Sequence, residues 1–186
     1  MSVLKKCKNC KKEFEPKNSF HSTCSVECAI SILVEKKKKK ESSEWRKRKS
    51  EIREKIKTVS DYRKDARFWF QRWIRMRDVG KTCISCGTLL TEITKFDAGH
   101  YYSASGTPQL LFNEINCSGQ CVFCNQHKSG NLIEYRKGII SRYGIDKLME
   151  LENIAEFKGK RIHTKEYYVD IAEEYKKRCK KLENIK

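Results

Sequence analysis

Eight of the ten cysteines fall into two groups whose spacing suits metal binding. The first group follows the pattern C-x2-C-x13-C-x3-C, and the second joins two CxxC pairs across 34 intervening residues. Four thiolates complete a tetrahedral zinc site and leave no position for a substrate, so both sites are predicted to be structural. The expected zinc ligands are Cys7, Cys10, Cys24 and Cys28 at the first site and Cys83, Cys86, Cys121 and Cys124 at the second.

The span between the two CxxC pairs of the second group, with the residues just after it, also carries polar side chains suited to chemistry. "KFDAGHYY" alternates like a strand, "PQLLF" predicts a second strand, and "CVFCNQHK" suits the start of a helix. Asp97 and His100 would then lie on a strand, Asn116 in a loop, and Asn125 and His127 on a helix. A hairpin and one helix are too small to fold alone, which explains the zinc ligands at both ends.

These side chains supply the parts needed to hydrolyse a phosphodiester. A neutral His100 would take a proton from water as the general base, and the Asn116 carbonyl would orient the ring by accepting from its other nitrogen. Oxygen ligands from Asp97 and Asn125 suit Mg²⁺ or Mn²⁺, which would bridge the scissile phosphate and the leaving oxygen.

Each of these residues also has a purely structural interpretation. His100 can be a packed strand residue beside two tyrosines, and Asp97 can cap a turn before Gly99. Asn116 can be a turn residue, and Asn125 can simply begin the helix. Two interpretations stay open for His127. It can be an ion ligand, or it can contact a phosphate together with Lys128.

A net charge of +17 points to a polyanionic partner, and nucleic acid is the first candidate. Counting Lys and Arg against Asp and Glu gives +3 for residues 1–34, +7 for 35–57, +4 for 58–81, −1 for 82–131 and +4 for 132–186. Only the segment with the candidate catalytic residues lacks an excess of basic residues. The neighbouring segments are therefore expected to bind the DNA backbone. The predicted DNA contacts are Lys36, Lys37, Lys38, Lys39, Lys40, Arg46, Lys47, Arg48, Lys49 and Lys128.

Good helix formers dominate the chain after the first cysteine group. Ser25 is a candidate cap for a helix that carries Cys28 in its first turn, and no glycine or proline follows until Gly80. The lysine-rich part has too few apolar residues to bury a full face. It is therefore a solvated helix, an arm that orders on a charged partner, or a soluble spacer.

Further helices are predicted on both sides of the second cysteine group. Residues 61–78 have apolar residues at spacings of three and four with arginines opposite, and we expect this stripe to pack on the module that follows. Residues 132–186 predict two or three helices, with breaks near Gly144 and Gly159 and with Thr164 capping the last. The stripe consists of Tyr62, Ala66, Trp69, Trp73 and Met76.

These elements predict an α+β fold that is mostly helical. Its expected parts are a four-cysteine zinc module over residues 1–34, a basic helical arm over 35–60, an amphipathic helix with a zinc-stabilised ββα-metal module of the HNH type over 61–131, and a helical region over 132–186. No apolar run approaches the length of about 20 residues that spans a bilayer, and the N-terminus lacks the apolar core of a signal peptide. We therefore expect a cytoplasmic protein without a membrane partner, in which Cys117 and Cys179 are reduced thiols.

Several segments resemble the phage lambda NinG family, also called Rap, along nearly the full chain. They are "CKNCKKEF", "CSVEC", "CISCGT", "DAGHY", "PQL" and "QCVFCNQHKSGNL", and the likeness is weakest in the lysine-rich arm and the final helix. The resemblance implies a phage recombination endonuclease of the HNH type, acting in the host cytoplasm on branched DNA such as Holliday junctions and D-loops.

The second cysteine group is also similar to that of the phage resolvase endonuclease VII, in which an asparagine directly after the last cysteine binds the metal. Asn125 has that position here. The commoner HNH pattern has an acidic residue immediately before the base histidine, where this chain has Gly99. Asp97 is two residues before Gly99, so it lies on the same face of the strand as position 99, about 6 to 7 Å along the strand. A bulge at Ala98 and Gly99 would close that gap. The NinG family also tends to have a histidine between the asparagine and the glutamine of "NCSGQC". This chain has Cys117, Ser118 and Gly119 there, so no such histidine can be catalytic.

Two other functions fit the same residues. One is a non-cutting, zinc-dependent DNA-binding protein that assists recombination, and the other is an HNH endonuclease of ordinary duplex DNA. Only the family resemblance separates cutting of branched DNA from cutting of duplex DNA. Two symmetric nicks in a junction would suit a homodimer, although no pattern in the sequence identifies one.

Overall fold

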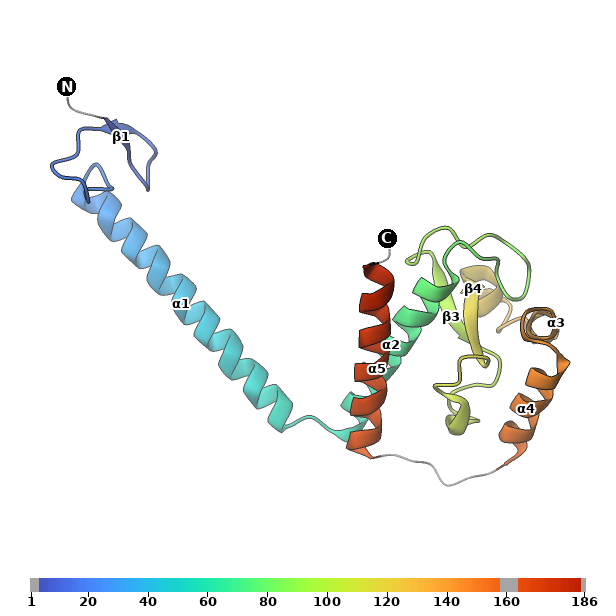
Figure 1. The fold of residues 1–186 in the computed structure, drawn as a ribbon. Helices are drawn as coiled ribbons and strands as arrows, with labels where there is room; N and C mark the ends of the chain where they lie inside the picture. Colours follow the sequence, from blue (N-terminus) through green and yellow to red (C-terminus); the bar gives the residue numbers. More distant parts are fainter. Residues whose placement is uncertain (1–3, 158–163, 185–186) are drawn as a thin grey trace. The chain divides into compact units, whose positions relative to one another are not determined.

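The structure is a computed structural model that describes residues 4–157 and 164–184. The chain forms two units, Met1–Lys57 and Thr58–Lys186, and each is described by itself (Figure 1). The fold is mostly helical α+β with two small sheets, as expected from the sequence.

The first unit consists of a small hairpin and one long helix. Strands β1 (Lys5–Lys6) and β2 (Glu13–Phe14) pair antiparallel, and helix α1 (Val26–Lys55) begins after Cys24 and carries Cys28 in its first turn. The predicted cap is confirmed, since Ser25 Oγ accepts a hydrogen bond of 3.3 Å from the Cys28 backbone N–H. None of the residues of α1 is buried, so the lysine-rich stretch is a solvated helix and begins before the expected arm.

The second unit is built around two helices that run side by side in the same direction. In Figure 1, α2 (Val59–Asp78) lies against α5 (Lys165–Glu183). Tyr62 and Tyr168, near the starts of the two helices, belong to one buried cluster. Thr58 caps α2 in a capping box, and Thr164 Oγ1 accepts from the Tyr167 N–H at 3.2 Å, which confirms the predicted cap.

Helix α2 packs on the module that follows it, and Tyr62 and Ala66 of the expected stripe are buried, but the rest of the buried row differs from the prediction. The buried positions recur every four residues and face the hairpin and α5. Trp69 and Trp73 are only partly buried at the edge of that cluster, and Met76 is half-buried. The stripe is shifted because the helix is covered on two sides, by the sheet and by α5. The buried row is Tyr62, Ala66, Phe70, Ile74 and Asp78.

The hairpin confirms one predicted strand and corrects the other. Strand β3 (Phe96–His100) pairs antiparallel with β4 (Cys117–Cys121), whereas "PQLLF" forms the 3-10 helix η1 (Pro108–Leu110) and a turn. Proline has no N–H to give to a ladder, and it suits the first position of a helical turn. Pairing is continuous through Ala98 and Gly99, so the suggested bulge is absent from this strand.

The helix expected from "CVFCNQHK" is a single π-helical turn, η2 (Phe123–His127). Three residues with positive φ, Ser129, Gly130 and Asn131, then redirect the chain before α3 (Leu132–Tyr143) begins. The break at Gly144 is confirmed, because its φ of +90° separates α3 from α4 (Ile145–Glu156). The predicted break at Gly159 falls outside the described residues.

The two faces of the hairpin have different neighbours. Ala98, His100 and Cys117 face α2 and α5, while Asp97 and Gly99 face η2 and α3. Direct cross-strand partners share a face, so Gln120 opposite Asp97 and Ser118 opposite Gly99 belong to the second face. On that face the Tyr135 hydroxyl donates a hydrogen bond of 2.8 Å to the Gly99 carbonyl.

A buried aspartate fastens α2 to the hairpin. Asp78 is fully buried, and its Oδ2 accepts from the Gly119 N–H at 2.8 Å and from Arg77 Nη2 at 2.7 Å. Burial would raise the pKa of Asp78, but hydrogen bonds and charge from Arg77 hold it below its ordinary value. Only glycine fits at position 119, because an added Cβ would lie 2.7 Å from Leu90 and 2.9 Å from Asp78.

Among the described helices, none combines the length and the apolar character needed to cross a bilayer.

Candidate functional site

Both predicted cysteine groups come together as compact four-sulfur clusters. The four Sγ atoms of each group lie within 4.8 Å of one another, and neighbouring sulfurs are 3.5 to 3.7 Å apart, as for Cys10 with Cys24 and Cys86 with Cys121. A tetrahedral site with Zn–S bonds of about 2.3 Å requires sulfurs about 3.8 Å apart. The two clusters can therefore hold zinc, as predicted.

Hydrogen bonds prepare the second cluster for thiolates. The backbone N–H of Cys121 donates to Cys83 Sγ at 3.4 Å, and Asn131 Nδ2 donates to Cys124 Sγ at 3.6 Å. Burial raises the pKa of Cys121 to about 12, and in the first cluster hydrogen bonding to Cys10 raises the pKa of Cys24 to about 12. The sulfurs of a cluster thus resist ionising together on their own, and zinc binding is expected to release protons.

The two oxygen ligands predicted for Mg²⁺ or Mn²⁺ lie side by side. Asp97 Oδ2 accepts from Asn125 Nδ2 at 2.9 Å and from Gln126 Nε2 at 2.9 Å. Asn125 reaches Asp97 because it directly follows Cys124 of the second sulfur cluster on η2, which covers this face of the hairpin. A carboxylate and an amide oxygen are hard donors of the kind that Mg²⁺ and Mn²⁺ prefer.

Position 99 has no room for the acidic residue of the commoner HNH pattern. A Cβ added to Gly99 would lie 2.2 Å from Gln120 Oε1 and 3.1 Å from Asn125 Oδ1. The buried Gln120 amide therefore occupies the space that such a side chain would need, and the carboxylate comes from Asp97 instead.

His100 lies on the opposite face of the hairpin from Asp97 and Asn125. Its ring centroid is 6.1 Å from that of Phe70, and its Nδ1 is 3.7 Å from Cys117 Sγ. Its Nε2 is 2.9 Å from the Leu111 carbonyl, which can only accept, so Nε2 carries the proton and Nδ1 the lone pair in the neutral ring.

The surroundings of His100 keep its imidazole neutral. Burial lowers the pKa of His100, the hydrogen bond to Leu111 partly offsets this, and the charge of Arg67 lowers it further. The neutral ring has the protonation state that a general base requires, although its Nδ1 lone pair accepts a hydrogen bond from the buried Cys117 thiol at 3.7 Å.

Asn116 does not make the hydrogen bond to His100 that the sequence suggested. It is fully buried, its Oδ1 accepts from the Tyr102 N–H at 2.8 Å, and its Nδ2 donates to the Leu110 carbonyl at 3.0 Å. Asn116 thus closes the loop between the strands and fixes Leu110 beside Leu111, whose carbonyl takes the expected orienting role. A side chain buried by distant segments satisfies the nearest backbone groups first.

His127 and Lys128 lie on the exposed side of η2. Side chains two residues apart on a helical turn point in opposite directions, so His127 faces away from Asn125. The His127 ring is 6.0 Å from that of Phe123, and Lys128 Nζ is 5.1 Å from the same ring. This placement favours the phosphate-contact interpretation of the pair over the ligand interpretation.

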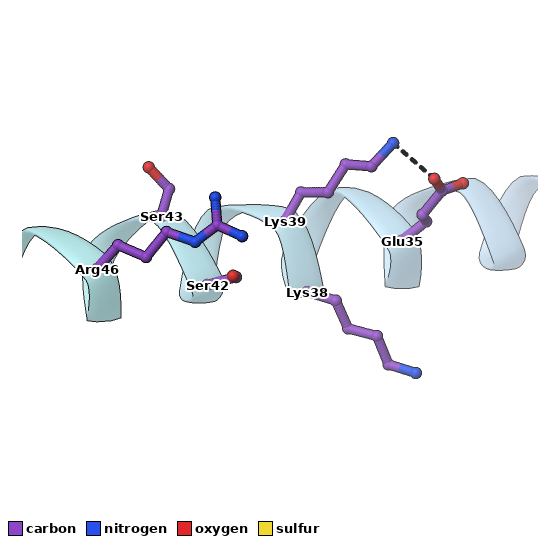
Figure 2. Close-up of a pocket in the computed structure, with 6 residues that line it drawn as sticks. All are labelled: Glu35, Lys38, Lys39, Ser42, Ser43 and Arg46. Carbon is purple, nitrogen blue, oxygen red and sulfur yellow. Dashed lines mark ion pairs between the residues drawn. The ribbon is translucent and has the colours of Figure 1, made fainter. Parts of the chain in front are cut away.

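The basic residues of α1 are distributed around the whole circumference of this exposed helix. Successive residues are about 100° apart around a helix of 3.6 residues per turn, so five consecutive lysines cannot share one face. Some pair with glutamates along the helix, as Lys39 does with Glu35 at 2.6 Å. Figure 2 shows this pair in a shallow hollow on α1 that is lined by Glu35, Lys38, Lys39, Ser42, Ser43 and Arg46.

A second basic surface, within the second unit, was not identified from the sequence. A hollow of about 550 Å³ lies between α2 and the loop after β3, and Arg63 Nη2 donates to the Ala104 carbonyl there at 3.4 Å. We call it the α2 hollow, and Arg67 connects it electrostatically to His100. The arginines of α2 were its only sequence signal. Its lining residues are Ser60, Arg63, Lys64, Arg67, Ala104, Ser105 and Pro108.

Comparison with known proteins relates the whole chain to one phage protein family. The family model described as Bacteriophage Lambda NinG protein matches residues 2–185. Protein ninG of Escherichia phage lambda is 39% identical over 165 residues, covering 80% of each chain. Protein ninG of Salmonella phage P22 is 39% identical over 168 residues, covering 82% of each chain. No solved structure matches the chain.

Proposed function

This chain belongs to the NinG family, and from that premise and the pairing of Asp97 with Asn125 we propose that it is a metal-dependent endonuclease of branched DNA. The observation that carries the proposal is the 2.9 Å contact between these side chains, one residue after a zinc ligand. A second cation site of oxygen donors beside a sulfur cluster suits an HNH-type centre, in which zinc holds the scaffold and another ion serves the chemistry.

Asp97 and Asn125 would hold Mg²⁺ or Mn²⁺ through their side-chain oxygens. When bound there, the ion would neutralise the scissile phosphate and stabilise the leaving oxygen. Asn125 must turn its oxygen toward Asp97 for this role, since its Nδ2 donates to Asp97 Oδ2 in the structure. Gln126 donates to the same carboxylate and would help to hold it in place.

His100 would accept the proton of the attacking water at Nδ1, in place of the hydrogen bond that the Cys117 thiol donates to that atom at 3.7 Å. It is the last residue of β3, so its ring and the Asp97 carboxylate can serve one phosphate only if that phosphate lies at the end of the hairpin, where the two faces meet. The Leu111 carbonyl would hold the Nε2–H throughout and stabilise the imidazolium that forms.

DNA would contact two basic surfaces. The exposed lysines of α1 supply positive charge along a solvated helix, which suits sequence-independent contact with the phosphate backbone. The α2 hollow adds arginines near His100 and would place one backbone phosphate beside the base.

One observation favours a different class of function, a zinc protein that binds DNA without cutting it. The His100 ring packs beside Phe70 and Cys117 on the face away from the candidate cation ligands. In that case His100 would be a core residue, and the Asp97–Asn125 contact would only close the hairpin against η2.

A nicking assay on a synthetic four-way junction and a matched linear duplex separates these functions. We expect the junction to be cut with Mg²⁺ or Mn²⁺ and not with chelator, and Asp97→Asn and His100→Ala to abolish cutting while DNA binding is retained. Asp170→Asn, an equally conservative change at an exposed residue of α5, serves as the control. Equal cutting of both substrates would indicate a duplex endonuclease, and no cutting with any ion would indicate the non-cutting protein.

A further inference from the structure

Gln120 is a fully buried glutamine whose amide nitrogen is hydrogen-bonded but whose amide oxygen is not. Its Nε2 donates to Ser85 Oγ at 2.7 Å and to the Gly130 carbonyl at 2.6 Å. Its Oε1 is buried and has no hydrogen-bond partner among the described residues. A buried acceptor without a partner is destabilising, so such an atom suggests that a partner arrives in another state of the protein.

The free oxygen of Gln120 is directed at the candidate cation site. Oε1 and Asn125 Oδ1 both face the same point beside Gly99, at 2.2 Å and 3.1 Å from the place of an added Cβ. Both oxygens can only accept, so neither can donate a hydrogen bond to the other. The Gln120 amide cannot turn to relieve this, because the Gly130 carbonyl can only accept and must keep its N–H donor.

We propose that Gln120 is a positioning residue that selects the cation-binding orientation of the Asn125 amide. A half-turn of that amide brings Asn125 Nδ2 toward Gln120 Oε1 and its Oδ1 toward Asp97. The buried acceptor then receives a hydrogen bond, and two oxygens of different residues face one cation. This inference rests on the cation site of the proposed function and adds the reason why its amide ligand is ordered.

The absence of a side chain at Gly99 is part of the same arrangement. Any larger residue would meet Oε1 within 2.2 Å and push the Gln120 amide away from Asn125. Gly99 and Gln120 therefore act together in place of the acidic residue of the commoner HNH pattern. They orient the amide ligand and leave the charge to Asp97.

Asn125→Asp distinguishes this role from simple electrostatics. A second carboxylate next to Asp97 would strengthen Mn²⁺ binding if charge alone mattered. It has no N–H for Gln120, and one of its oxygens would face the buried Oε1. We therefore expect Asn125→Asp to weaken Mn²⁺ binding by about tenfold, which is within the coupling range of contacting residues.

The test is a double-mutant cycle on the zinc-loaded full chain, with Mn²⁺ binding measured by electron paramagnetic resonance and calorimetry in the absence of DNA. Gln120→Met keeps the length of the side chain and removes the acceptor, together with the N–H donors to Ser85 and the Gly130 carbonyl. In that background we expect Asn125→Asp to strengthen Mn²⁺ binding instead. Asp97→Asn shows whether the measured ion lies at this site, and zinc content reports whether each variant has folded.

Each outcome decides between this inference and the proposed function. If Asp97→Asn leaves Mn²⁺ binding unchanged, the cation site itself is wrong and the role of Gln120 falls with it. If Asp97 matters but Asn125→Asp binds Mn²⁺ more tightly than the natural chain, the site stands and the role of Gln120 is wrong. Should Gln120→Met lose its zinc, the direction of the Asn125→Asp effect alone decides.

Discussion

The same four-cysteine chemistry serves two different structural purposes in this chain. In residues 4–57 the buried residues are Cys7 and Thr23, and the first cluster leads into a helix with no buried side chain. In the second unit Cys83 and Cys124 are buried with Leu90 and Phe96, and the cluster lies under a hairpin that is packed on both faces. The first cluster therefore takes the place of a hydrophobic core. The second cluster lies beside a hydrophobic core and supports the segment that carries the polar side chains.

Removing zinc should have the largest effect and should divide the two units. The binding free energy of structural zinc is typically about 10–16 kcal/mol, and the first cluster has almost no other source of stability. With a strong chelator we expect residues 5–28 to lose hydrogen-exchange protection completely, while α2 and α5 keep theirs through their shared core. Equal loss in both units would contradict the comparison.

Breaking the buried charge of the second unit should be the next largest effect. Asp78→Ala leaves Arg77 and the Gly119 N–H without their partner, and loss of one member of a buried ion pair typically costs about 3–5 kcal/mol. Urea unfolding measures this change. The exposed control Asp170→Ala should stay within about 0.5 kcal/mol. A small effect at Asp78 would show that the hairpin does not depend on α2.

The acid sensitivity of the second unit should depend on His100. Its folded pKa is below the unfolded value of about 6.5, so its contribution to stability is complete above that pH and is lost as pH falls through the folded pKa. We expect the unfolding free energy to decline from pH 7 downward, and His100→Gln to remove part of that decline. Identical pH profiles of the two proteins would show that His100 is not buried in solution.

Neutralising α1 should leave stability unchanged and alter only DNA binding. Replacing residues 36–40 by glutamine is expected to weaken binding similarly for junction and duplex. The slope of log affinity against log salt should fall by about 0.9 for each DNA phosphate that the protein no longer neutralises. An unchanged slope would show that these lysines do not touch the backbone. A charge-matched control replaces Lys165, Lys176, Lys177, Lys180 and Lys181 of α5.

Local patterns in the sequence were enough to locate several features. The eight cysteines of the two clusters, the caps Ser25 and Thr164 and the break at Gly144 all came from residue types at short spacings. Strand 96–100 followed from alternation. The second strand did not, because "CSGQC" has no alternation and is strand only through pairing with β3.

Only the tertiary structure decided which side chains lie next to one another. Asp97 and Asn125 meet because η2 folds over one face of the hairpin, while His100, three residues from Asp97, is on the other face. Asp78 and Gln120 had no sequence signal, since an acidic or amide side chain looks the same whether exposed or buried. Ligand spacing and caps depend on neighbours along the chain and can be read from it. Burial and partners depend on segments that approach only when the chain has folded.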